Sequence, residues 1–236
     1  MELTPAVVRL PADLDAVSVA ALTRALRDAC ASPAPVVALV GASDETYCLG
    51  LALGRHDAAA PAQAFADVLA AMHAAPKPLL AVVDGRAIGG GMGLACACDW
   101  LIATDRASFG LPELLWGLVP AIIWPVIADR VGGPVARRWA VSAHTRSAAE
   151  GLAAGLVDHL VTPDGLDAAV RRATRALCRL DTGALRHLRA WARASQQVDL
   201  PTALRLGADL TTLLGRDPAV RDRWQAFADG DAPWSA

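Results

Sequence analysis

The chain has 236 residues and a hydrophobic fraction of 54%, enough to bury one substantial apolar core, with or without an appended helical piece. Its formal net charge is −2 and its 22 basic residues are dispersed, which argues against nucleic-acid binding. No apolar run approaches the length that spans a bilayer, and the N-terminus lacks the pattern of a secretory leader. We therefore expect a soluble, cytoplasmic protein.

The cysteine and lysine content excludes two further classes of chemistry. Five cysteines form an odd set without the paired spacing of a metal site, so we expect reduced, buried thiols and no metal. Lys77, between two prolines at the entrance of a strand, is the only lysine. A Schiff-base mechanism is therefore not expected.

The first third of the chain alternates between short apolar runs and amphipathic segments. Strands are expected at 7–10 and 36–40, with an amphipathic helix over 18–30 between them. A second helix is expected over 63–75, and it ends before Pro76. Alternating strands and helices predict an α/β layer arrangement.

The central stretch of the chain combines a strand, a glycine turn and a helix. An apolar run at 79–83 is followed by three consecutive glycines at 89–91 and then by an apolar segment with helical spacing at 92–98. Such a turn lets main chain approach a ligand closely, and the first N–H groups of the helix have no partner within it. The pattern predicts a place that stabilises negative charge on an oxygen.

A single acid, Glu113, follows in the apolar segment SFGLPELLWGLVP. An isolated carboxylate in such a setting has to be paired, solvated or catalytic, because burying a lone charge is unfavourable. The alternative to a catalytic role is a structural acid that caps a helix or forms an ion pair.

The last third of the chain is mostly helical. A helix is expected over 135–141, and a further one begins with Ser147 as N-cap and Glu150 three residues later. A short strand at 157–161 precedes a change to arginine-rich helical sequence, which predicts a core over 1–164 and a C-terminal helical region over 165–236. Helices in that region are expected at 166–180, 183–195, 201–214 and 217–227.

Four segments in register resemble the crotonase, or enoyl-CoA hydratase/isomerase, family: YCLG, VDGRAIGGGMGLACACD, ASFGLPELLWGLVP and SAAEGLAAGLVDHLV. The resemblance implies the crotonase (ClpP-like) spiral of ββα units, with C-terminal helices through which such proteins form trimers or hexamers. It also implies an acyl-thioester substrate, delivered by CoA or by an acyl carrier protein, and no cofactor.

The resemblance assigns roles to individual residues. The backbone N–H groups of Leu49 and Gly90 correspond to the two donors that hold the enolate oxygen, and Glu113 corresponds to the acid that moves the proton. Gly93 stands where hydratases of the family have a second glutamate. This chain is therefore expected to work with one acid.

Three further residues are candidates for the substrate pocket. His56 and Asp57 lie in the loop that borders the pocket in the family, where one of them could act as a second acid or base or both could be solvated loop residues. Trp116 could line the acyl pocket or fill the core.

Within the family, Gly93 together with SFGLPELLWGLVPAIIWPVIADRVGG is most similar to the dehydratases of polyketide β-branching. That similarity implies removal of water from a 3-hydroxy-3-methylglutaryl group on an acyl carrier protein. Two alternatives stay open. One is an enoyl-CoA hydratase or isomerase acting on a CoA thioester, and the other is a catalytically silent scaffold that binds a partner or an acyl chain.

Overall fold

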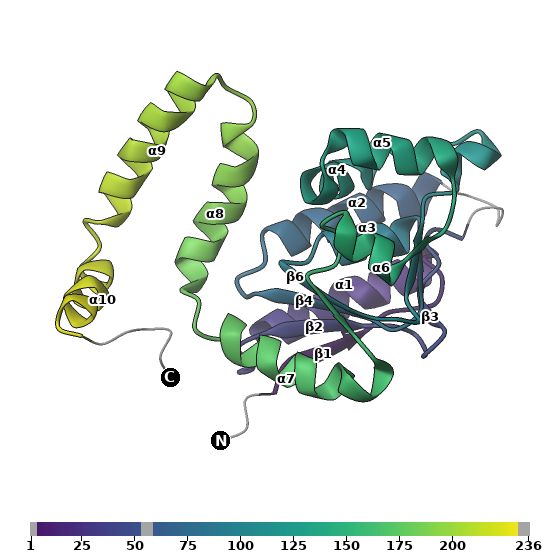
Figure 1. The fold of residues 1–236 in the computed structure, drawn as a ribbon, viewed down its shortest axis with the longest axis horizontal. Helices are drawn as coiled ribbons and strands as arrows, with labels where there is room; N and C mark the ends of the chain where they lie inside the picture. Colours follow the sequence, from purple (N-terminus) through teal and green to yellow (C-terminus); the bar gives the residue numbers. More distant parts are fainter. Residues whose placement is uncertain (1–3, 53–58, 231–236) are drawn as a thin grey trace. The chain divides into compact units, whose positions relative to one another are not determined.

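The computed structural model describes residues 4–52 and 59–230. The chain divides into two compact units, with the boundary between Thr182 and Gly183. The first unit holds two β-sheets and their helices, and the second is helical (Figure 1). The helices of the first unit are α1 (Ala16–Ala31), α2 (Ala59–His73), α3 (Gly90–Cys96), α4 (Trp124–Val131), α5 (Gly133–Ser142), α6 (Ala148–Ala153) and α7 (Leu166–Leu177). The second unit contains α8 (Thr182–Ser195), α9 (Leu200–Leu214) and α10 (Pro218–Ala228).

The first unit contains two sheets. The five-stranded sheet is parallel, in the order β1 (Ala6–Arg9), β2 (Val37–Val40), β4 (Leu79–Val83), β6 (Trp100–Thr104) and β9 (His159–Val161). The four-stranded sheet has the order β3 (Thr46–Cys48), β5 (Arg86–Ile88), β7 (Ser108–Gly110) and β8 (Arg146–Ser147), with only β8 antiparallel.

The chain repeats one pattern three times: a strand of the first sheet, a strand of the second sheet, then a helix. The repeats are β2-β3-α2, β4-β5-α3 and β6-β7-α4, with a short 3-10 helix, η1 (Glu113–Trp116), before α4. This is the spiral of ββα units that the family resemblance implies, so the expected fold class is confirmed.

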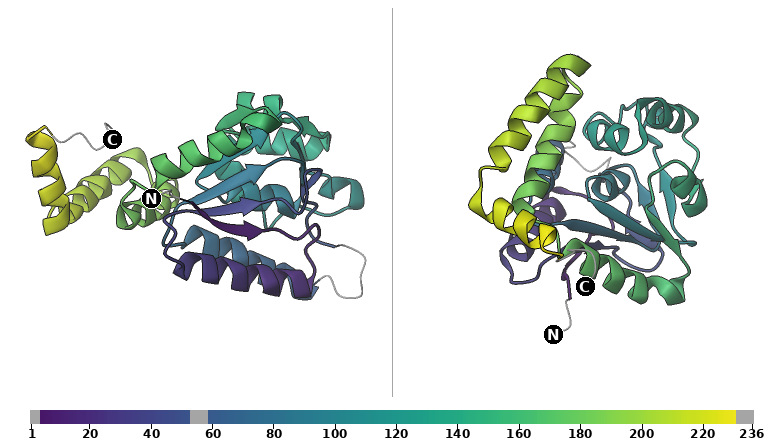
Figure 2. Two further views of the ribbon diagram at one scale, coloured as in Figure 1. Left: turned by 90° about the horizontal axis from the view of Figure 1, so that it is seen from below. Right: turned by 60° about the vertical axis from the view of Figure 1, so that its left-hand side comes forward.

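The five-stranded sheet is buried on both faces. Alternate residues such as Val37, Leu39 and Ala81 belong to the main core, which α1 and α2 share. The intervening residues, Ala38, Leu80 and Ile102 among them, form a second core with α7. Figure 2 shows α1 and α2 on one face of this sheet and α7 on the other. Strands buried on both sides read as continuous apolar runs.

Because α7 packs against the sheet, the boundary between the two units lies later in the chain than predicted. Ala169 and Leu177 of α7 are buried against the sheet, so this helix belongs to the first unit. The boundary expected at residue 164 therefore lies one helix too early. Other elements match closely: β4 has the predicted bounds, and Ser147 with Glu150 forms the predicted capping box. The strand β6 was not expected.

Two carboxylates fix the sheet to the helices that border the glycine turn. Asp99, three residues after the end of α3, accepts the Leu79 N–H at 2.7 Å. Asp158 accepts the Leu101 N–H at 2.7 Å and forms an ion pair with Arg130 of α4. Because these acceptors hold strand amides, they set where α3 and α4 sit on the sheet.

In the described ranges, no helix combines the length and hydropathy needed to traverse a bilayer.

Two fully buried threonines offer a matched test of the core. Thr174 Oγ1 has no hydrogen-bond partner in the part of the chain that the structure describes, whereas Thr104 Oγ1 donates to Asp84, which also pairs with Arg106. We expect Thr174→Val to leave the free energy of unfolding unchanged or raise it by up to about 1 kcal/mol. Thr104→Val should lower it by about 1–3 kcal/mol, because Asp84 loses a donor. Chemical denaturation of both variants measures the difference, and equal effects would contradict this account.

Candidate active site

The glycine turn presents a main-chain N–H that has no acceptor among the described residues. Gly89 is the N-cap of α3 with φ +50°, a left-handed conformation that glycine adopts without strain, and α3 begins at Gly90 rather than at Met92 as expected. The Gly89 N–H donates to the Gly110 carbonyl, and the Gly93 N–H donates to Gly89. For the Gly90 N–H no hydrogen bond is seen to any residue in the described ranges. This amide matches the position predicted for an oxyanion donor.

The neighbouring segment approaches the turn main chain to main chain. A Cβ on Gly50, whose φ is +87°, would lie 2.7 Å from the Gly90 nitrogen. A Cβ on Gly91 would lie 1.9 Å from the Cys48 carbonyl oxygen. Side chains at these positions would push β3 and α3 apart or cover the Gly90 amide. Both glycines are therefore required by contact distance.

The second predicted donor already has a partner. The Leu49 N–H donates to the Ala12 carbonyl at 2.7 Å, and Leu14 forms a parallel bridge with Leu51. The segment after β1 thus pairs with the residues that follow β3 and uses the Leu49 amide. The predicted pair of free amides is wrong in this respect, and Gly90 is the one of the two that stays available.

Glu113 lies at the start of the glycine turn. Its Oε1 would be 2.8 Å from a Cβ on Gly89, the residue that precedes Gly90, and its Oε2 is buried with no hydrogen-bond partner among the described residues. Burial raises the pKa of this carboxyl above its ordinary value, against a smaller lowering effect of its own backbone N–H. A partly desolvated acid next to an unused N–H donor is suited to move a proton beside a polarised carbonyl group.

The other predicted pocket residues fall into three cases. Gly93 is buried on α3, where a Cβ would lie 2.3 Å from Ile123 Cγ2. Trp116, three residues after Glu113, is 61% exposed and so does not fill the core. His56 and Asp57 lie outside the described residues.

Sequence reasoning missed Gly50 and Ile123. The YCLG motif placed Gly50 in a loop after a strand, but only the structure brings it against Gly90. Ile123 read as one apolar residue among many in AIIWPVI.

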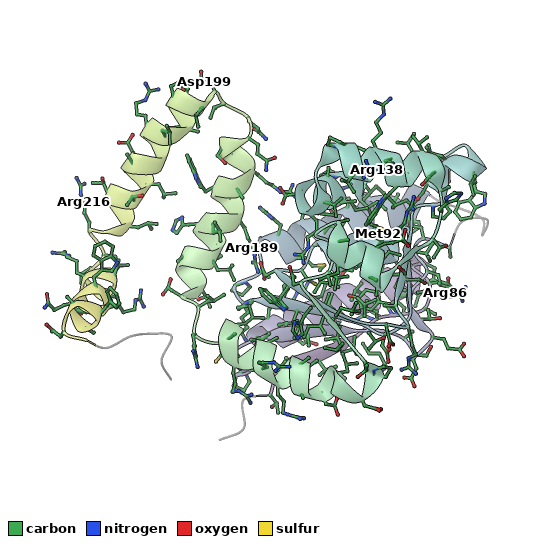
Figure 3. The ribbon with its side chains drawn as sticks, in the orientation of Figure 1. Arg86, Met92, Arg138, Arg189, Asp199 and Arg216 are labelled. Atoms are coloured by element: carbon green, nitrogen blue, oxygen red, sulfur yellow. The ribbon has the colours of Figure 1, made fainter. Side chains whose placement is uncertain are left out.

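In the described part of the chain, no group of His, Cys, Asp and Glu is arranged to hold a metal ion. Figure 3 labels Met92, fully buried in α3, and Arg86, exposed on β5.

The structure combines a spiral of ββα units with a glycine turn and the carboxyl group of Glu113 against that turn. The resemblance described in the sequence analysis associates this combination with proteins that act on acyl thioesters. A family model described as enoyl-CoA hydratase/isomerase matches residues 12–235. The chain belongs to the enoyl-CoA hydratase/isomerase family.

Individual relatives agree with this assignment. A probable enoyl-CoA hydratase of Mycolicibacterium paratuberculosis is 40% identical over 61% of this chain, which spans 55% of that relative. A crotonyl-CoA hydratase of Syntrophomonas wolfei is 30% identical over 81% of this chain and 76% of its own length. The crystal structure of an enoyl-CoA hydratase from Shewanella pealeana superposes with a TM-score of 0.84 at 23% identity, covering 98% of this chain and 93% of that one. This last likeness shows the fold.

The contact between Gly50 and Gly90 can be tested against a glycine of similar backbone conformation. Gly155 has φ +78°, and no atom lies within 4 Å of the place that a Cβ would take there, so Gly155→Ala introduces backbone strain alone. We expect that variant to lower the free energy of unfolding by about 1 kcal/mol. Gly50→Ala should lose about 1–3 kcal/mol more, because its Cβ overlaps the Gly90 nitrogen. Thermal and denaturant unfolding give both values, and equal losses would show that the close approach is not required.

Proposed function

We propose that the protein is an enzyme that acts on acyl-CoA thioesters by forming an enolate, with Glu113 as the group that moves the proton. The observation that carries this proposal is the partly buried Glu113 carboxyl, whose Oε2 has no hydrogen-bond partner within residues 4–52 and 59–230 and whose Oε1 faces Gly89. Removal of a proton next to a thioester carbonyl places negative charge on the carbonyl oxygen. That oxygen needs a donor close to the acid.

The Gly90 N–H is the donor in this proposal. It belongs to the first turn of α3, where main-chain N–H groups have no acceptor within the helix, and Gly90 is buried against Gly50, Leu14 and Phe65. A fixed N–H donor in a site of low polarity stabilises developing negative charge by up to about 3–4 kcal/mol. Because the chain supplies both the donor and the proton acceptor, the proposed chemistry needs no metal or redox cofactor.

CoA is the favoured carrier of the acyl group. The two curated relatives are named for CoA thioesters, an enoyl-CoA hydratase and a crotonyl-CoA hydratase. The polyketide β-branching reading, with a 3-hydroxy-3-methylglutaryl group on an acyl carrier protein, is the second candidate. Its support is the single acid together with glycine at position 93. Neither of the two relatives is named for that activity, so CoA delivery is the main proposal.

A panel of substrates tests the carrier and the acid together. We expect turnover of unsaturated or 3-hydroxy acyl-CoA thioesters, and slower turnover of the same acyl groups on a phosphopantetheinylated carrier protein. Glu113→Gln should lower turnover at least about 100-fold on every accepted substrate, because the amide cannot accept the proton. Mass spectrometry of the products measures both. Faster turnover on the carrier protein would favour the β-branching reading, and binding without turnover by the wild type would identify a silent scaffold.

The Glu113→Gln variant also has a predictable effect on the stability of the folded protein. Because burial raises the pKa of Glu113, the ionised form destabilises the folded protein, and this destabilisation grows as the pH rises through the raised pKa. Glu113→Gln should therefore gain stability over the wild type at pH 7 and gain less at pH 4. Glu150→Gln is the matched control, since the capping box and Arg146 lower the pKa of Glu150 and its loss should destabilise at pH 7. Thermal unfolding at the two pH values compares them.

We further propose that the chain self-associates through its C-terminal helices, as trimers or hexamers. The support is a set of apolar side chains that are each more than half exposed on α9 and α10: Leu200, Leu204, Leu213, Trp224 and Phe227. Large exposed apolar side chains in such number are typical of an interface.

Analytical ultracentrifugation of the full chain tests this. We expect three or six chains per particle, and Leu204→Glu should shift the distribution toward the single chain. Val17→Glu, at a 77% exposed apolar position on α1, is the control and should not change it. A wild-type chain that stays monomeric would contradict the proposal.

A further inference from the structure

Two side chains from the segment that follows α3 contact this helix at glycines that lie one turn apart. The Gly93 N–H donates to the Gly89 carbonyl at 3.0 Å, so these glycines lie one turn apart. The missing side chain of Gly89 leaves space for Glu113 Oε1, and that of Gly93 leaves space for Ile123. The acid and the isoleucine therefore contact α3 at adjacent turns, on either side of the Gly90 amide in sequence.

Ile123 fills its position completely. It is only 2% exposed, and a Cβ on Gly93 would lie 2.3 Å from its Cγ2 and 2.8 Å from its Cβ. Ile123 is the N-cap residue of α4, and its carbonyl accepts the Ile127 N–H at 3.1 Å. Arg130 of the same helix is tied to Asp158 and to the Leu156 carbonyl. The helix that carries Ile123 is thus held from its other end, so the side chain has little freedom to withdraw.

The two described segments that meet at this contact offer no side-chain group that would hold a water molecule. Residues 120–123 (PAII) and 90–95 (GGMGLA) contain no side-chain hydroxyl, amide or carboxyl group. Addition of water to a double bond requires a water that is positioned and deprotonated by polar groups. The branched apolar side chain of Ile123 fills the space beside Gly93, one turn of α3 from the contact of Glu113 with Gly89, and so leaves no room for such a water there.

We infer that Ile123 is a specificity-determining residue that favours transfer of a proton within an enoyl thioester over addition or removal of water. The inference rests on the proposed function, because it assumes that Glu113 and Gly90 form an enolate. In the favoured reaction, the Glu113 carboxylate takes a proton from C2 of a 3-enoyl thioester, and the electrons of the broken C–H bond form the enolate. The protonated Glu113 then returns the proton to C4 as the double bond moves to C2–C3, and the thioester carbonyl is restored.

A pair of variants of nearly equal shape isolates the effect of polarity. Ile123→Val and Ile123→Thr differ only by a methyl group against a hydroxyl group, and the hydroxyl can hold a water. The assay uses purified full-length protein with 3-hexenoyl-CoA for the shift of the double bond and crotonyl-CoA for hydration. We expect the ratio of hydration to double-bond shift to rise at least about tenfold in Ile123→Thr relative to Ile123→Val. Ile127→Thr, at a fully buried position one turn further along α4, should leave the ratio unchanged.

Deuterium exchange separates this inference from the proposed function. Incorporation of deuterium at C2 of an acyl-CoA in D₂O reports enolate formation whatever the final product is. If the wild type shows no exchange, the proposed function fails. If exchange is present but Ile123→Thr and Ile123→Val give the same ratio, or Ile127→Thr changes it equally, the role of Ile123 is overturned.

A stability cycle tests the contact even if a single variant folds poorly. Gly93→Ala should lower the melting temperature, because its Cβ overlaps Ile123. In the Ile123→Gly background the nearest remaining atom of residue 123 is its Cα, 3.8 Å away, which is ordinary contact. Gly93→Ala should then be harmless, and glycine is acceptable at the N-cap position of α4. Equal effects of Gly93→Ala in both backgrounds would overturn the statement that Ile123 occupies this space.

Discussion

The site depends on the close approach of two stretches of main chain, the residues after β3 and the first turn of α3. Cys48 and Gly50 lie so near Gly91 and Gly90 that no side chain fits between them. This contact fixes the direction of the Gly90 N–H and keeps its surroundings buried. It also explains why glycines occur on both segments, since a single Cβ on either side would separate the strand from the helix.

Glu113 places a carboxyl group where the described part of the fold offers its Oε2 no hydrogen-bond partner. Burial raises the pKa of this carboxyl. The acids elsewhere in the first unit behave differently, because Asp99 and Asp158 accept strand N–H groups and so contribute to the sheet. A carboxyl group that weakens the folded state while its neighbours strengthen it is expected at a position retained for chemistry. Stability and activity therefore act in opposite directions at this residue.

The chain has the spiral of ββα units, and Ile123 forms an apolar wall beside Gly93. The space next to Gly93 is not an empty place for a second acid, because Ile123 fills it. Hence a glutamate at position 93 would require α4 to move. The acid, the amide and the apolar wall all meet one turn of α3, which makes the first turn of this short helix the element that relates the proposed chemistry to the proposed selectivity.

The sequence alone determined the features that follow local rules. The glycine turn, the strand β4, the capping box of Ser147 and the lone acid Glu113 could be found because each depends on neighbouring residues. The tertiary structure decided the rest. The Leu49 N–H donates to the carbonyl of Ala12, a residue far away in sequence, and α7 packs against the sheet. The apolar run of β6 is too short to distinguish from part of a helix. Ile123 acquired its role only where α4 meets Gly93. Occupied amides and filled volumes depend on which distant segments come together, and no local pattern of residues records that.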